Sequence, residues 1–150
     1  MKTSDNILVA LDFSESPEDV LARVLALHPK ADIRIILLHV VPDIPHTSYF
    51  IESSHPWIDV HRISLETAET AMERYMNVLS AALPDAIITP VVREGVASDR
   101  IVQIANRHNV DYIIMGDHCR SGLTHMFHAN VAEHVIRNAR RNVLSFYVPS

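Results

Sequence analysis

The densest group of chemically capable side chains follows Gly116, within residues 117–130. It contains a thiol, a guanidinium group and several imidazoles: His118, Cys119, Arg120, His125 and His128. Arginine and histidine can neutralise phosphate charge, whereas cysteine with histidine can hold a metal ion or form a reactive thiolate. A metal site is not favoured, because the spacing matches no recognised zinc array and the chain has no second cysteine. A catalytic cysteine would need a nearby base, which sequence adjacency to His118 does not supply.

A carboxylate stands at a second position of interest, Asp12, directly after the apolar run Ile7–Leu11. There it could accept hydrogen bonds from an amine or a hydroxyl group of a ligand. It could equally cap the turn that leads to Ser14 and Ser16. The residue types leave both interpretations open.

These polar positions lie in a chain in which two kinds of apolar segment alternate, one typical of strands and the other typical of helices. Five are short, rich in β-branched residues and nearly continuous in hydrophobicity, as expected for strands covered on both faces: Ile7–Leu11, Ile33–Val41, Ile87–Val92, Tyr112–Met115 and Val143–Val148. The segments between them show helical spacing of apolar residues, with stripes through Val20–Leu25, Leu65–Leu79, Ile101–His108 and Val131–Ile136. The order predicts a single α/β domain over residues 1–150, a doubly wound five-stranded parallel sheet flanked by four helices.

Helix start signals support these boundaries. Ser16 followed by Pro17 offers a capping hydroxyl and a proline at the first helical position. Asn130 and Glu133 have the spacing of a capping box, with asparagine in place of serine or threonine. The long irregular stretch from Pro42 to Trp57 follows the second strand, and loops of that length are often functional.

Ligands of open α/β sheets bind at the carboxyl ends of the strands, where the strand order reverses. With the order 3-2-1-4-5, that point lies between the first and fourth strands. The candidate binding residues there are Ala10, Asp12, Val41, Met115 and Gly116.

Composition narrows the class of protein. The formal net charge is -5 with histidine neutral, which disfavours nucleic-acid binding. No apolar run approaches the roughly 20 residues of a membrane span. The single cysteine excludes an intrachain disulfide and agrees with a reducing compartment, so a cytoplasmic protein is expected.

Several segments, in order along the chain, resemble the universal stress protein family. They are Ile7–Ser14, Leu38–Val41, Gly95 with Asp99 and Ile101, Asp111–Leu123, and Asn130–Val135 with Val143 and Leu144. The resemblance spans the whole chain and implies an adenine nucleotide α-hydrolase-like fold. It also implies a non-catalytic role in stress adaptation, with ATP or AMP, and magnesium, as possible ligands.

ATP-binding members of that family carry glycines after the fourth strand, because phosphate oxygens approach backbone N–H groups most closely where no Cβ intervenes. Here Gly116 is kept, Cys119 and Ala129 occupy the other glycine positions, and Asn130 replaces a serine or threonine. The resemblance places Cys119, Arg120, Ala129, Asn130 and Val131 at the nucleotide, and it leaves nucleotide binding itself open.

The last strand ends the sequence, and an apolar edge strand left open would aggregate. The resemblance implies pairing of last strands across a homodimer, through Val143, Leu144, Phe146 and Val148. Two other hypotheses remain: a dimeric interaction module that binds no nucleotide, and a small enzyme, such as a slow nucleotide hydrolase, that uses the same cleft.

Overall fold

The computed structural model of the chain describes residues 4–27, 29, 32–42, 56–117 and 129–147. Strands and helices alternate along these residues: β1 (Ser4–Leu11), α1 (Pro17–Ala26), β2 (Asp32–Val41), α2 (Pro56–Ala82), β3 (Ile87–Glu94), α3 (Ala97–Arg107), β4 (Tyr112–Asp117), α4 (Ala129–Ala139) and β5 (Asn142–Tyr147). The predicted order of strands and helices is confirmed.

All neighbouring strands are parallel, and their spatial order is β3-β2-β1-β4-β5. The predicted doubly wound sheet is therefore confirmed, with the reversal of strand order between β1 and β4. The register places Leu11 opposite His39 of β2, and Ala10 opposite Met115 of β4. The carboxyl ends of β1, β2 and β4 thus meet at one edge of the sheet.

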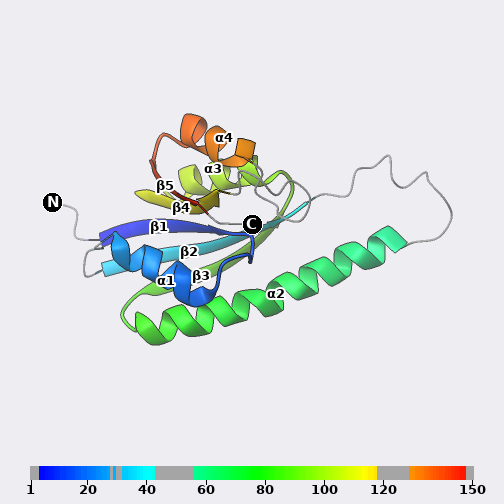
Figure 1. The fold of residues 1–150 in the computed structure, drawn as a ribbon, viewed down its shortest axis with the longest axis horizontal. Helices are drawn as coiled ribbons and strands as arrows, with labels where there is room; N and C mark the ends of the chain where they lie inside the picture. Colours follow the sequence, from blue (N-terminus) through cyan, green and yellow to red (C-terminus); the bar gives the residue numbers. More distant parts are fainter. Residues whose placement is uncertain (1–3, 28, 30–31, 43–55, 118–128, 148–150) are drawn as a thin grey trace.

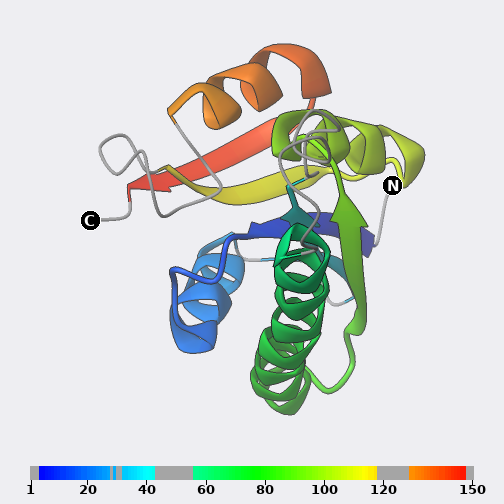
Figure 2. The same ribbon diagram turned by 90° about the vertical axis from the view of Figure 1, so that its right-hand side faces the viewer.

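The helices form two layers, with α1 and α2 on one face of the sheet and α3 and α4 on the other (Figures 1 and 2). Each layer encloses its own apolar cluster, and the alternation of side chains along β1 divides them. Leu8 is fully buried against the α3–α4 side, and Ile7 is fully buried against the α1–α2 side. Burying each such side chain contributes about 1.5–3 kcal/mol to folding. Because both faces of β1 are buried, the sequence of this central strand is a continuous apolar run.

The sequence prediction of the first helix start is confirmed at the level of single atoms. Ser16 is the N-cap of α1, and its hydroxyl accepts a hydrogen bond from the backbone N–H of Asp19 at 3.1 Å. Pro17 opens the helix, where the absence of an N–H removes no intrahelical bond.

Other predicted boundaries were wrong by a few residues. The helix α4 begins at Ala129, so Asn130 lies inside its first turn and is not the capping residue. The strand β4 continues through Gly116 to Asp117, because pairing with Phe146 and Tyr147 of β5 extends the ladder past the apolar run. The strand β3 likewise continues to Glu94, and β5 runs from Asn142 to Tyr147.

Two predicted helix stripes were also too wide. Leu25 of α1 is 47% exposed and Ile136 of α4 is 53% exposed, since a helix lying on a sheet buries only a narrow face. His108 lies beyond the last residue of α3, at its C-cap, and is exposed. Among the described residues, none of the helices is both long and apolar enough to cross a membrane.

Candidate functional site

The loop that leaves β1 is a tight turn built on Asp12. The Oδ1 atom of Asp12 accepts hydrogen bonds from the backbone N–H of Ser14, at 2.9 Å, and from the Ser14 hydroxyl, at 2.5 Å. The turn-capping interpretation of Asp12 is therefore realised in the structure. It does not exclude the ligand interpretation, since a carboxylate has acceptor sites on both oxygens.

Phe13, inside this turn, has a φ of 64°, in the left-handed region that non-glycine residues rarely adopt. This conformation costs about 1–2 kcal/mol for a residue with a Cβ. The Phe13 ring stacks on His39 with a centroid distance of 4.1 Å and lies 5.7 Å from the ring of Tyr75. Aromatic pairs contribute about 0.5–1.5 kcal/mol each beyond their buried area, so these contacts offset the backbone strain.

His39 is buried near the end of β2, with 6% of its surface exposed. Its Nδ1 atom lies 2.7 Å from the carbonyl oxygen of Leu11, so Nδ1–H donates to that carbonyl and ties β2 to the end of β1. Burial lowers the pKa of His39 below 6.5, although the hydrogen bond to Leu11 and the charge of Asp12 act in the opposite direction. The imidazole is therefore neutral at pH 7, with its proton on Nδ1.

Tyr75, on α2, holds the turn from the other side. Its hydroxyl donates a hydrogen bond to the backbone carbonyl of Glu15. Burial raises the pKa of Tyr75 to about 12, and the negative charge of Asp12 adds to the increase. The phenol stays protonated at pH 7 and acts as a hydrogen-bond donor.

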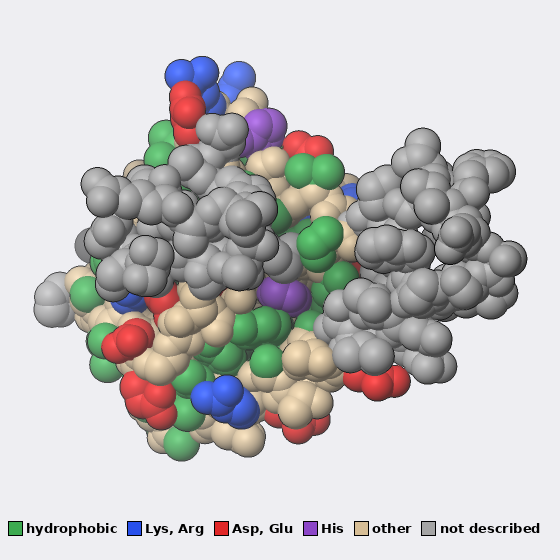
Figure 3. Space-filling view, turned by 45° about the vertical axis from the view of Figure 1, so that its right-hand side comes forward, with side chains coloured by type: hydrophobic (Ala, Val, Ile, Leu, Met, Phe, Trp, Pro, Cys, Tyr) green, Lys and Arg blue, Asp and Glu red, His purple; other side chains and the backbone are tan. Residues whose placement is uncertain are grey.

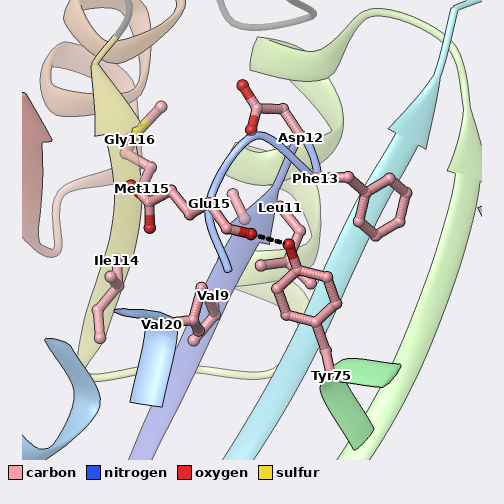
Figure 4. A pocket seen from close by; sticks show the side chains of 11 residues that line it. Val9, Leu11, Asp12, Phe13, Glu15, Val20, Tyr75, Ile114, Met115 and Gly116 are labelled. Carbon is pink, nitrogen blue, oxygen red and sulfur yellow. Dashed lines mark hydrogen bonds between the residues drawn. The ribbon is translucent and has the colours of Figure 1, made fainter. Parts of the chain in front are cut away.

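The side chain of Glu15 links the turn to α1 and β5. Its Oε2 atom lies 3.0 Å from Nε of Arg23, and the Arg23 guanidinium sits 4.2 Å from the centre of the Phe146 ring. The other carboxylate oxygen of Glu15, Oε1, is buried without a hydrogen-bond partner among the residues that the structure describes. In Figure 4 this side chain reaches from the turn toward Met115 on β4.

A small cavity, called here the β1–β4 cavity, lies between the carboxyl ends of β1 and β4 (Figure 4). Its volume of about 10 Å³ has room for one water molecule, so it could not enclose a whole ligand. The cavity is lined by strand ends, the turn and one residue each of α1 and α2: Val9, Ala10, Leu11, Asp12, Phe13, Glu15, Val20, Tyr75, Ile114, Met115 and Gly116.

The structure brings together four of the predicted binding residues, Ala10, Asp12, Met115 and Gly116, around this cavity. Their role in binding stays a prediction. Val41 ends β2 nearby, but it does not line the cavity, and its carbonyl accepts a hydrogen bond from Gly95 N–H at 3.0 Å.

The remaining residues predicted to bind lie in the first turn of α4 or outside the described residues. Val131 packs, partly buried, against the apolar cluster on the α3–α4 side of the sheet. Ala129 and Asn130 begin α4, and their side chains are outside the description. Cys119, Arg120, the histidines of the same loop, residues 43–55 and Val148 also lie outside the described residues.

Sequence reasoning missed the side chains that fix the turn: Phe13, Glu15, His39 and Tyr75. A signal existed for His39, because it is the one polar residue in the apolar run from Ile35 to Val41. A polar group buried in a central strand needs a partner, and here the partner is the backbone carbonyl at the end of the neighbouring strand.

On the face drawn in Figure 3, hydrophobic side chains gather at the centre, with acidic and basic side chains scattered around them.

Comparison with known proteins agrees with this architecture. The sequence profile of the universal stress protein family matches residues 3–146. A universal stress protein of Methanocaldococcus jannaschii is 28% identical over 148 residues, which cover 92% of this chain and 91% of that protein. Its solved structure gives a TM-score of 0.69 at 25% identity, with 99% of each chain covered.

Two further solved structures share the fold at lower identity. A universal stress protein of Arabidopsis thaliana with AMP bound has a TM-score of 0.62 and 17% identity, covering 97% of this chain and 93% of its own. A universal stress protein in complex with cAMP has a TM-score of 0.62 and 15% identity, covering 99% of this chain and 100% of its own.

Proposed function

Because the chain belongs to the universal stress protein family, we propose that it is a non-catalytic regulatory module whose β1–β4 cavity is the floor of an adenine-nucleotide site. The observation that carries the proposal is that Asp12, Met115 and Gly116 line one cavity, where the strand order reverses. Structural neighbours with AMP and with cAMP support the choice of ligand class.

The non-catalytic part of the proposal rests on how the polar groups near the cavity are used. The imidazole of His39 and the hydroxyl of Tyr75 are both engaged with backbone carbonyls, of Leu11 and Glu15. The raised pKa of Tyr75 makes it a poor base or nucleophile at pH 7. These groups hold the turn in shape, and we assign the role of contacting the ligand to the Asp12 carboxylate, which lines the same cavity.

Asp12→Asn tests this assignment, because asparagine keeps an oxygen that can accept from Ser14 while it removes the negative charge. We expect the wild-type chain to bind AMP or ATP in calorimetric titrations, with and without magnesium, and the variant to bind at least about tenfold more weakly. Asp32→Asn, an exposed aspartate at the start of β2, is the matched control.

No heat and no thermal shift with AMP, ADP or ATP at millimolar concentration would contradict nucleotide binding and favour an interaction module. Steady formation of a hydrolysis product, abolished by Asp12→Asn, would contradict the non-catalytic part. Equal weakening by Asp12→Asn and Asp32→Asn would show that the charge of the whole protein, and not this site, affects affinity.

We also propose a homodimer formed along β5. This strand lies at the end of the sheet order, so among the described residues one side of its backbone has no neighbouring strand. Leu144 and Phe146 pack against the α1–α2 cluster and Val143 against the α3–α4 cluster, so backbone hydrogen bonds would supply much of the pairing. A monomeric mass by light scattering at micromolar concentration would contradict the dimer.

A further inference from the structure

The opposite edge of the sheet contains a larger cavity, called here the amino-edge cavity, with a volume of about 200 Å³. It lies at the starts of β1, β2 and β3 and at the turn that precedes β4. The lining residues are Asn6, Ile7, Arg34, Ile35, Ile36, Ile87, Thr89, His108 and Val110. None of them lines the β1–β4 cavity.

The floor of the amino-edge cavity is set by the register of three strands. Asn6, Arg34 and Ile87 are opposite one another across β1, β2 and β3, and Ile36 is opposite Thr89 in the next row. Ile36 packs against the cluster on the α3–α4 side, so alternation along β2 places Arg34 on that same face. The two rows form a patch with apolar and polar positions side by side.

The helix α3 ends at Arg107, and the turn that follows it borders the patch through His108 and Val110. The turn after α3 supplies the wall, where Val110 is fully buried and its N–H donates to the carbonyl of Ala105 at 3.1 Å. Ile87 is left 59% exposed beside the cavity. A large apolar side chain next to an uncovered cavity is a feature of ligand sites.

The polar groups of the cavity indicate the charge of a ligand. Arg34 has no ion pair or hydrogen bond with another described residue, and its guanidinium is a donor that matches a carboxylate. The Oδ1 atom of Asn6 is buried and has no hydrogen-bond partner among the described residues. The nearby Asp111 carboxylate is engaged by the Asn6 backbone N–H at 2.8 Å.

We propose that the amino-edge cavity binds a small branched hydroxy-carboxylate. The ligand carboxylate pairs with Arg34, its hydroxyl donates to Oδ1 of Asn6, and its branched carbon chain lies against Ile36 and Ile87. A cavity of about 150 Å³ holds benzene, so 200 Å³ suits a molecule of about eight non-hydrogen atoms. The site is separate from the proposed nucleotide site, and neither proposal depends on the other.

The probe that matches this chemistry is 2-hydroxy-3-methylbutanoate, titrated into the full chain while backbone amide signals are followed by NMR. We expect saturable shifts at the amides of Ile36, Thr89 and Val110, with a dissociation constant on the order of 1 mM. Amides near Asp12 and Met115 should not shift. An absence of saturable shifts at the cavity, or shifts confined to the β1–β4 cavity, would overturn the proposal.

Two related probes test the assigned contacts. The neutral amide 2-hydroxy-3-methylbutanamide should bind at least about tenfold more weakly, because it cannot form the charged pair with Arg34. The deoxy compound 3-methylbutanoate should bind several-fold more weakly, because Oδ1 of Asn6 stays without a donor. Equal affinity of the acid and its amide would contradict a carboxylate ligand, and equal affinity of the deoxy compound would contradict the role of Asn6.

Arg34→Gln should weaken binding of the hydroxy acid at least about tenfold. Arg93→Gln removes the same charge from an exposed position near the carboxyl end of β3 and should leave the affinity unchanged. Ile87→Glu, at an exposed position that does not endanger folding, should abolish binding by placing a carboxylate in the cavity. Similar loss in Arg34→Gln and Arg93→Gln would show only general electrostatic attraction and would overturn the site.

Discussion

At the carboxyl end of β1 the chain makes a tight turn whose polar groups are tied to their surroundings. Phe13 is stacked, His39 and Tyr75 bind backbone carbonyls, and Glu15 is paired with Arg23. At the amino end, by contrast, Ile87 is exposed, Arg34 is unpaired among the described residues, and a larger cavity stays open. The carboxyl end is thus preorganised around a small cavity. The amino end has a larger cavity, and fewer interactions among the described residues fix the side chains that line it. The comparison predicts that substitutions at the two ends will have very different effects on stability.

The largest difference should appear between Leu11→Ala and Ile87→Ala. Leu11 ends β1 and is 4% exposed, whereas Ile87 begins β3 and is 59% exposed. Removing a buried leucine side chain lowers the free energy of unfolding by about 2–5 kcal/mol. The exposed isoleucine should change it by no more than about 0.5 kcal/mol. Urea denaturation followed by circular dichroism measures both, and similar losses would mean that the amino end is packed in solution as tightly as the carboxyl end.

A smaller effect should come from the left-handed backbone of Phe13. Both Phe13→Ala and Phe13→Gly lose the ring contacts with His39 and Tyr75. Glycine adopts a φ of 64° without the steric cost of about 1–2 kcal/mol that alanine bears. We therefore expect the glycine variant to be more stable than the alanine variant by about 1 kcal/mol in the same denaturation experiment.

The pair of substitutions at Glu69 provides the control for Phe13. Glu69 is exposed in the interior of α2, where alanine should be more stable than glycine by about 1 kcal/mol. The two positions should therefore rank glycine and alanine in opposite orders. The same order at both positions would contradict the strained turn.

The contrast between the ends of the sheet also explains what the sequence could predict. The five apolar runs and four helical stripes were sufficient for the strand order, because burial on both faces leaves a continuous apolar signal. The same argument placed Ala10, Asp12, Met115 and Gly116 at one edge of the sheet. Topology alone determines which strand ends meet, so these positions needed no knowledge of side-chain contacts.

The details of the turn could not be predicted in that way. Nothing in the sequence around Phe13 marks a left-handed residue, because the conformation depends on rings supplied by β2 and α2. The amino-edge cavity was also missed, since it results from where α3 ends relative to the strands, and helix ends are the least reliable part of a sequence prediction. Asn130 illustrates the same weakness, because a helix that starts at Ala129 turns an expected cap into a residue of the first turn.

The smallest effect should be the pH dependence of stability that His39 confers, which His39→Asn tests because its amide nitrogen can replace Nδ1–H as the donor to the Leu11 carbonyl. Because burial lowers the pKa of His39, the unfolded chain takes up a proton near pH 6.5 while the folded chain does not. The free energy of unfolding should therefore fall as the pH decreases from 6.5 toward the pKa of the folded state. His39→Asn removes that contribution, so the stability of the variant should depend less steeply on pH in this window than the stability of the wild type does.

His108→Asn replaces an exposed histidine at the amino edge and should keep the wild-type dependence when both variants are measured by urea denaturation between pH 5 and 8. A wild-type slope in His39→Asn would mean that this imidazole is accessible to protons in the folded state, and the carboxyl end would then be less closed than its contacts indicate.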